Sequence, residues 1–132
     1  MTLHELNEHY RLLQELAKAV RLRDSLRAAA EPGAQVLTGQ PHAPGYQNKL
    51  GNLAAEIADV SRDIDKLNTR ISVQEKAISA FVQAIGDPLA RTVFTLRFLR
   101  GMAWGEVAAV VGGGNTPAAV SNICYRYMGK SC

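Results

Sequence analysis

Side chains that could bind a metal or perform acid–base chemistry are few in this sequence and lie far apart. The histidines are His4, His9 and His42, and the two cysteines are Cys124 and Cys132. His4 and His9 are five residues apart, so on a helix they diverge and make a poor metal pair. We find neither a nucleophile with a matching base nor paired carboxylates suited to a catalytic cleft. The sequence therefore predicts a protein that is not an enzyme and that needs no metal or cofactor.

Polar and basic side chains gather near the C-terminal end, on a segment that starts at residue 116. Small and polar residues at the start of a helix can reach base edges in the major groove of DNA, and basic residues further along can neutralise phosphates. Asn122 carries the amide that pairs with adenine, and Arg126 and Lys130 lie one turn apart, which suits the DNA backbone. The candidate DNA-binding residues of this segment are Thr116, Ala118, Ala119, Ser121, Asn122, Tyr125, Arg126 and Lys130. Upstream, Arg97 and Arg100 are candidate phosphate contacts or part of a solvated face.

The distribution of charge along the chain agrees with an anionic partner for this end. The 132 residues hold 15 basic and 12 acidic side chains, for a net charge of +3. Residues 1–31 and residues 49–86 are each electroneutral, residues 32–48 carry no charge, and the whole excess lies in residues 87–132. A local basic excess favours nucleic acid, so the expected partner is double-stranded DNA.

Membrane and secretory classes are not expected for this chain. It has no run of 18 apolar residues, and its first residues alternate polar and apolar types without a basic region followed by an apolar one. Two cysteines near one end form no disulfide framework. We expect a cytoplasmic protein that does not engage a membrane.

Two long helices are predicted to precede the polar segment. Over residues 2–31, apolar residues follow alternating three- and four-residue steps, with Thr2 and Glu5 as a capping box and Pro32 as the stop. Over residues 46–85 the same repeat continues unbroken from Leu50 to Ile85, and Gln74 is its one polar member. The uncharged segment 32–45 is expected to be a linker.

A helix of about 40 residues is about 60 Å long and cannot bury its apolar stripe alone. The simplest solution is an antiparallel hairpin in which residues 2–31 fold back on residues 46–85. An intermolecular coiled coil satisfies the same pattern. We prefer the intrachain hairpin, and its homodimerisation remains open.

Three shorter helices are predicted in residues 87–132. Asp87 and Pro88 begin the first, the second covers residues 104–111, and Thr116 caps a third over residues 116–128. The expected buried residues of the first and third are Leu89, Val93, Phe94, Leu96, Leu99, Val120, Ile123, Cys124 and Tyr127, and the apolar residues of the second are Val107, Ala108 and Val111. A glycine-rich turn, residues 112–115, joins the last two helices, as in a helix-turn-helix. The expected fold is all-α, with a long antiparallel helical hairpin in residues 1–86 followed by a three-helix helix-turn-helix domain in residues 87–132.

Residues 91–128 resemble region four of sigma-70-type factors. The matching residues are Arg91, Val93, the Leu96-Arg97-Phe98 run, Gly101, the Glu106-Val107-Ala108 run, Gly112 and Val120. Over its full length the chain resembles small phage and prophage regulatory proteins of Gram-positive bacteria, in which a charged helical hairpin precedes such a domain. The resemblance implies binding to promoter or operator DNA and control of phage gene transcription, with RNA polymerase as a further possible partner.

The chain departs from the family pattern in ways that bear on function. Ala103 stands where the family has a capping Ser or Thr, and the predicted recognition helix is poor in Arg and Lys. Few phosphate contacts imply weak binding with a shallow salt dependence, so that dimerisation or a partner is needed. The alternatives are a protein-interaction module that contacts RNA polymerase or another regulator, and a phage DNA-packaging subunit similar to a small terminase.

Overall fold

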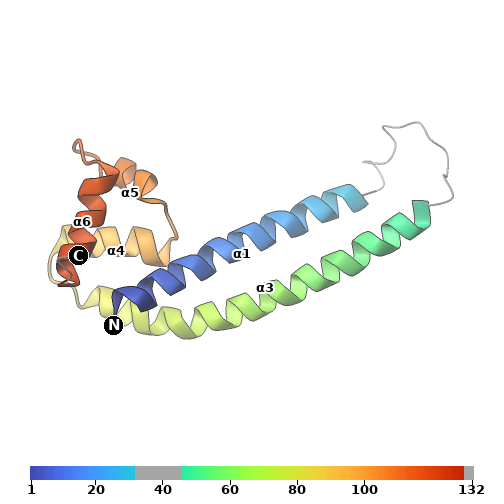
Figure 1. The fold of residues 1–132 in the computed structure, drawn as a ribbon, viewed down its shortest axis with the longest axis horizontal. Coiled ribbons are helices and arrows are strands. Elements are labelled where there is room, and N and C mark those ends of the chain that lie inside the picture. Colours follow the sequence, from blue (N-terminus) through green and yellow to red (C-terminus); the bar gives the residue numbers. More distant parts are fainter. Residues whose placement is uncertain (32–45, 130–132) are drawn as a thin grey trace. The chain divides into compact units, whose positions relative to one another are not determined.

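The chain is helical in the computed structural model, which describes residues 1–31 and 46–129 (Figure 1). The elements are α1 (Leu3–Ala30), α3 (Tyr46–Gln83), α4 (Pro88–Phe94), η2 (Thr95–Leu99), α5 (Trp104–Val111) and α6 (Pro117–Tyr127). Every element in these ranges is helical, which confirms the predicted all-α class. The predicted linker 32–45, together with Lys130, lies outside the described residues. None of the described helices has the length and apolar character needed to cross a membrane.

The described residues form two compact units. The first comprises residues 1–14 and 70–129, and the second comprises residues 15–69. The first unit therefore combines the start of α1, the end of α3 and all the helices that follow, and the candidate DNA-binding residues described in the structure belong to it.

The first turn of α1 has the predicted capping box. The Glu5 backbone N–H donates to Thr2 Oγ1 at 3.1 Å, and the Thr2 backbone N–H donates to Glu5 Oε1 at 3.1 Å. Two backbone donors that lack helical partners are thereby satisfied. This cap fixes where α1 begins, and Leu6, one turn later, is fully buried.

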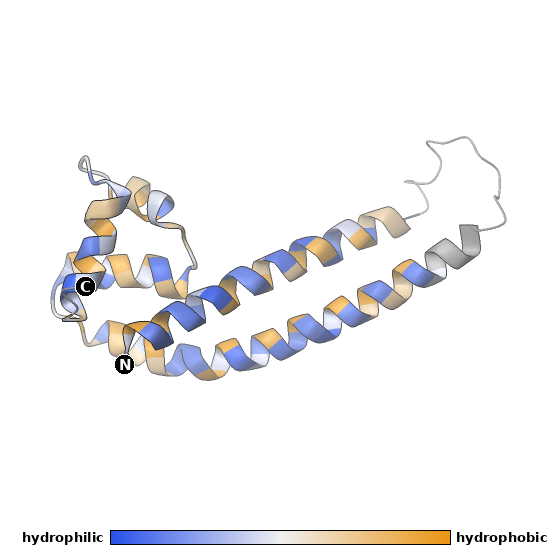
Figure 2. Cartoon of the chain, viewed as in Figure 1, coloured by the Kyte–Doolittle hydropathy of each residue, from blue (hydrophilic) through white to orange (hydrophobic). Residues whose placement is uncertain are grey.

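Phe94 lies at the centre of the first unit's core. Its ring centroid lies 5.8 Å from that of Phe81, 5.8 Å from that of Phe98 and 5.4 Å from that of Tyr127. The buried members of this cluster are Leu6, Ile78, Val82, Ile85, Ala90, Phe94, Phe98 and Cys124, and a neighbouring cluster contains Val93, Val107, Ala108 and Val120. Side chains of α1 and α3 thus share a core with α4, η2 and α6. Figure 2 colours the apolar residues of all these helices orange, whether they are buried or exposed.

Among the expected core residues of the C-terminal helices, Val93, Phe94, Val120 and Cys124 are buried and Leu96, Leu99 and Ile123 are half-buried, but two expectations are wrong. Leu89 is 43% exposed and Tyr127 is 44% exposed. Ala90 and Val93 are the residues of early α4 that face the core, and Leu89 is rotated by about 100° from Ala90 on the helix. Tyr127, the last residue of α6, contacts the Phe94 ring edge to face and is otherwise largely open to solvent. Phe98, which was not in the predicted set, is fully buried.

The helix that begins at Pro88 does not stay α-helical to its end. Thr95–Leu99 form a wider π-helical turn, in which the Arg100 backbone N–H donates to the Thr95 carbonyl oxygen at 3.0 Å. The Thr95 hydroxyl donates to the Arg91 carbonyl oxygen at 2.8 Å, a bond that competes with the regular helical ladder. Gly101 follows with a φ of 72°, a left-handed conformation that favours glycine and ends the helix.

Gln74, the one polar residue in the apolar repeat of α3, has a buried hydrogen-bond partner on α1. The side-chain oxygen of Gln74 lies 2.9 Å from Nδ1 of His9, whose side chain is 1% exposed. Since an amide oxygen only accepts, the ring proton belongs on Nδ1, and His9 Nε2 is a buried acceptor without a hydrogen-bond partner. Gln74 therefore occupies a core position because it satisfies a buried histidine.

Replacing Gln74 with Leu should destabilise the protein, because it leaves the buried N–H of His9 without an acceptor. We expect the free energy of unfolding in urea to fall by about 1–3 kcal/mol. The double variant His9→Leu/Gln74→Leu should recover most of this loss, since no orphaned donor remains. Gln83→Leu, an exposed change of the same kind on α3, is the control. A Gln74→Leu protein as stable as the wild type would contradict the role of Gln74 as the hydrogen-bond acceptor for His9.

Candidate nucleic-acid interface

The connection between α5 and α6 requires its glycines. Gly112, Gly113 and Gly114 have φ values of 69°, 65° and 77°, a left-handed run that side chains with a Cβ rarely adopt. Asn115 closes the turn, because its side-chain N–H donates to the Gly112 carbonyl oxygen at 2.8 Å. The chain therefore reverses within five residues, between Val111 and Pro117.

The starts of α5 and α6 are stabilised differently. At α6, Thr116 Oγ1 accepts the Ala119 backbone N–H at 3.1 Å and Pro117 occupies the first turn, as predicted. At α5, Ala103 has no side-chain acceptor, and only the reciprocal bond exists, from the Ala103 N–H to Glu106 Oε1 at 3.0 Å. Glu106 is thus occupied in ordering the start of α5.

The inner face of α6 is anchored in the core. Val120 and Cys124 are fully buried, Val120 in the cluster with Val93 and Val107, and Cys124 in the cluster with Phe94. These residues are four positions apart, so they lie on one side of the helix. The opposite side of α6 is left for solvent or for a partner.

The exposed side of α6 carries four of the predicted DNA-binding residues. Thr116, Ala118, Asn122 and Arg126 are exposed, and the last three follow at steps of four, which places them along one face. This face offers a methyl group, then an amide, then a guanidinium. The structure therefore brings together the small, the polar and the basic candidate in the predicted order.

Other candidates on α6 are less available. Ala119 and Ser121 are half-buried, and the Ser121 hydroxyl donates to the Ala118 carbonyl oxygen at 3.0 Å. Tyr125 is half-buried, and its ring meets that of Trp104 edge to face at 6.4 Å. These three residues sit at the flank of the exposed face.

Arg97, a candidate phosphate contact, lies instead between two aromatic rings. Its guanidinium carbon is 3.5 Å from the ring centroid of Tyr10 and 4.4 Å from that of Trp104. One terminal N–H donates to the Met102 carbonyl oxygen at 3.2 Å, and Nε is buried without a partner. Burial lowers the pKa of this guanidinium below its ordinary value. We therefore remove Arg97 from the candidate contacts and treat it as a packing residue.

The first half of α1 also holds the segment that leads into α5. The side-chain amide of Gln14 donates to the Gly101 carbonyl oxygen at 2.7 Å, and Tyr10, one turn earlier, covers Arg97. Arg97 in turn contacts Trp104, the first residue of α5. Sequence reasoning missed this arrangement, although the four-residue spacing of Tyr10 and Gln14 on one face of a helix was visible.

The acids of the C-terminal helices are engaged with backbone groups. Asp87 accepts the Ala90 backbone N–H at 2.9 Å, and Glu106 accepts that of Ala103. Arg91, Arg100 and Arg126 are exposed, as are both acids. Arg91 donates to the Ile85 carbonyl oxygen at 2.9 Å. Residues 87–129 carry four arginines against these two acids, so this part of the first unit has a net positive charge.

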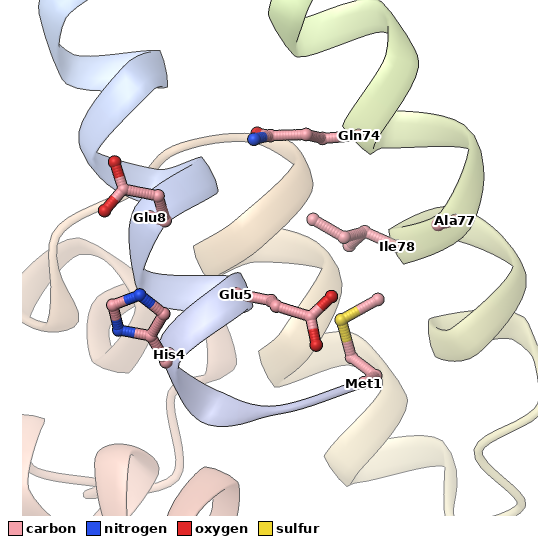
Figure 3. Close-up of a pocket in the computed structure, with 7 residues that line it drawn as sticks. All are labelled: Met1, His4, Glu5, Glu8, Gln74, Ala77 and Ile78. Atoms are coloured by element: carbon pink, nitrogen blue, oxygen red, sulfur yellow. The ribbon is translucent and has the colours of Figure 1, made fainter.

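A small pocket at the start of α1 and the end of α3 offers no comparable chemistry (Figure 3). Its lining residues are Met1, His4, Glu5, Glu8, Gln74, Ala77 and Ile78. Glu5 caps α1, and Glu8 pairs with Arg11, whose hydrogen bond lowers the pKa of that carboxyl. No group of three metal-ligating side chains occurs within residues 1–31 and 46–129.

Comparisons of this chain with protein-family models, with curated proteins and with solved structures gave no match. The assignment of function therefore rests on the residues and on the resemblance that they carry.

Replacing Arg97 with Ala should lower stability, because both rings lose the cation and Trp104 loses packing. We expect the free energy of unfolding to fall by about 2 kcal/mol, as for a desolvated cation–π contact with a packed aliphatic stem. The Arg97→Lys protein should have a stability between those of the wild type and of Arg97→Ala, since lysine keeps the charge but cannot stack. Arg100→Ala should change stability by less than about 0.5 kcal/mol. Equal effects of the two alanine variants would refute the packing role.

The buried thiol on the inner face of α6 should make stability depend on alkaline pH. Burial raises the pKa of Cys124 from 9.0 to about 12. The folded chain therefore keeps this proton above pH 9 while the unfolded chain loses it, so stability is lost as pH rises from about 9 towards 12. Urea unfolding should be measured at neutral pH and near pH 10 on the Cys132→Ser protein and on Cys124→Ala/Cys132→Ser. Between these pH values, the free energy of unfolding should fall further in the protein that keeps Cys124. Equal falls in the two proteins would contradict the raised pKa of Cys124.

Proposed function

We propose that this chain is a DNA-binding transcriptional regulator of phage or prophage type, which places α6 in the major groove. The observation that carries the proposal is the exposed face of α6, with Ala118, Asn122 and Arg126 in line and Val120 and Cys124 anchored behind them. A helix held by its inner face and free on its outer face is the form in which major-groove recognition helices work.

The order of side chains along that face suits the groove. Alanine at position 118 lets the start of the helix come close to the bases and can contact a thymine methyl group. Asn122, one turn later, can bond the N6 and N7 edge of adenine. Arg126, a further turn on, suits a phosphate at the groove wall.

The charge distribution supports modest affinity. Arg91, Arg100 and Arg126 are the exposed guanidiniums of the described C-terminal helices, and Arg97 is taken up by packing. About three phosphate contacts give a slope of about −3 when the logarithm of the binding constant is plotted against that of the salt concentration. Such a protein binds appreciably only at low salt or with a second DNA-binding unit beside it.

The regulatory assignment comes from the resemblance of residues 91–128 to sigma region four. That segment contains most of α4, the π-helical turn, α5 and α6, and a glycine turn joins α5 to α6. A regulator of this type acts in the cytoplasm, on promoter or operator DNA, and has no catalytic activity of its own.

A second candidate function is contact with RNA polymerase or another regulator. Val110 of α5 is 59% exposed, and its neighbour Ala109 is exposed as well. Exposed apolar side chains next to a DNA-binding helix suit a protein partner. The two functions are compatible, since α5 and α6 present different faces.

Selection from random duplexes followed by fluorescence anisotropy at low salt tests the DNA-binding proposal. Arg126→Ala should weaken binding to all duplexes similarly and reduce the salt slope by about 1. Asn122→Ala should cost about 1–3 kcal/mol and relax the preference at one base pair. Lys76→Ala, which removes an exposed charge from α3, is the matched control and should bind like the wild type.

Absence of binding to any duplex at low salt would overturn the DNA-binding proposal. In that case, RNA polymerase capture that is lost with Val110→Glu would favour the second candidate. Ring-shaped assemblies would favour DNA packaging.

A further inference from the structure

The start of α5 has less local support than the starts of α4 and α6. Asp87 and Thr116 cap α4 and α6 with side-chain oxygens, whereas Ala103, at the same place before α5, has none to offer. A helix start without such a cap depends more on contacts with other parts of the fold. The turn that leads into α5 is therefore the place to look for such contacts.

Two side chains bond the backbone of this turn, and one of them belongs to α1. The Gln14 side-chain amide donates to the Gly101 carbonyl oxygen at 2.7 Å, and Arg97 donates to the Met102 carbonyl oxygen at 3.2 Å. A Cβ atom placed on Gly101 would lie 3.5 Å from side-chain atoms of Leu13 and Gln14, so α1 packs directly beside the turn. The start of α1 thus holds the chain where it enters α5.

A second line of contacts leads from α1 to the side of α6, within the first unit. The Arg97 guanidinium lies over the rings of Tyr10 and Trp104, and the Trp104 ring meets that of Tyr125 edge to face. Charge interactions with Tyr10 and Tyr125 partly oppose the lowering of the Arg97 pKa by burial, which agrees with the nearness of both side chains to this cation. One guanidinium therefore connects α1, α5 and α6.

Tyr125 lies beside the DNA-reading face of α6, which consists of Ala118, Asn122 and Arg126. At about 100° per residue, Tyr125 is rotated by about 60° from Asn122 around the helix axis. The inner side of α6 is seated in the core, whereas Tyr125 is held at a flank. Contacts on the inner side and on a flank together fix the rotation of a helix, and with it the direction in which its outward side chains point.

We propose that Tyr10 and Gln14 of α1 are positioning residues for the DNA-reading face, so that the first fourteen residues belong to the DNA-binding unit. This inference rests on the proposed function. Tyr10 acts through Arg97 and Trp104, and Gln14 acts through the turn at Gly101.

Sequence-specific and non-specific binding differ in how far they depend on such positioning. Base readout needs side chains that are held in place by the residues around them. Attraction to phosphates depends on charge and carries no sequence information. Loss of the α1 contacts should therefore weaken binding to a preferred sequence and leave binding to other sequences nearly unchanged.

Binding of the full chain to two duplexes tests this proposal. One is the tightest duplex selected from random sequences, and the other has an unrelated sequence. Anisotropy is measured at low salt, at a temperature at which circular dichroism shows every variant fully folded. Tyr10→Ala and Gln14→Ala should each bind the selected duplex about tenfold more weakly than the wild type, as when about a tenth of the molecules hold α6 in the competent position. Affinity for the unrelated duplex should stay within about twofold of the wild-type value.

Two variants of α1 serve as controls. Tyr10→Phe keeps the ring beside Arg97 and should bind both duplexes like the wild type. Asn7→Ala removes an exposed amide from the same helix, as a match for Gln14→Ala, and should also bind like the wild type. Partial unfolding lowers both affinities by the same factor, so the ratio of the two affinities separates positioning from stability.

The outcomes distinguish this inference from the proposed function. A wild type that binds neither duplex would overturn both. A wild type that prefers the selected duplex, with the same preference in Tyr10→Ala and Gln14→Ala, would overturn the positioning role alone. Gln14→Ala, which removes no ring from the fold, decides the matter by itself if Tyr10→Ala does not fold.

Discussion

The burial of the end of the α3 stripe beneath the C-terminal helices is the contact on which the rest of the structure depends. Ile78, Val82 and Ile85 are each no more than 2% exposed, and they share a cluster with Phe94 and Cys124. Full burial of side chains of this size stabilises by about 1.5–3 kcal/mol each. The short helices α4, α5 and α6 are below the length at which isolated helices are stable in water, so they rely on this core.

The same core determines what α6 can offer a partner. Since Val120 and Cys124 occupy its inner side, the residues at positions 118, 122 and 126 must point outward. Arg97 shows the converse, because the rings of Tyr10 and Trp104 take its charge into the packing. A guanidinium on a predicted basic helix is thus not automatically a phosphate contact.

Local patterns predicted most of the fold but not every placement. The helix bounds, the caps at Thr2, Asp87 and Thr116, and the glycine turn follow from residues within one or two turns of each other, and the structure has them. The misplacement of Arg97 arose from a contact with Tyr10, which is far away in the sequence.

The exposure of Leu89 and the burial of Phe98 show that the side of a short helix that faces the core is hard to predict from the sequence. Both belong to apolar positions of one short helix, and which of them is covered depends on the helices packed against it and on the π-helical turn at Thr95–Leu99. An extra residue in a turn shifts the face of everything after it. On α6, the burial of Val120 and Cys124 was predicted and leaves Ala118, Asn122 and Arg126 exposed, whereas Tyr127, predicted on the same inner side, is exposed.

The number of exposed charges bears on the proposed DNA binding. On that proposal, α6 offers a single described exposed guanidinium to the phosphates, so one copy binds weakly. Joining two copies makes the second binding event intramolecular and can raise the overall affinity by about 10²–10⁴ without a new contact to DNA.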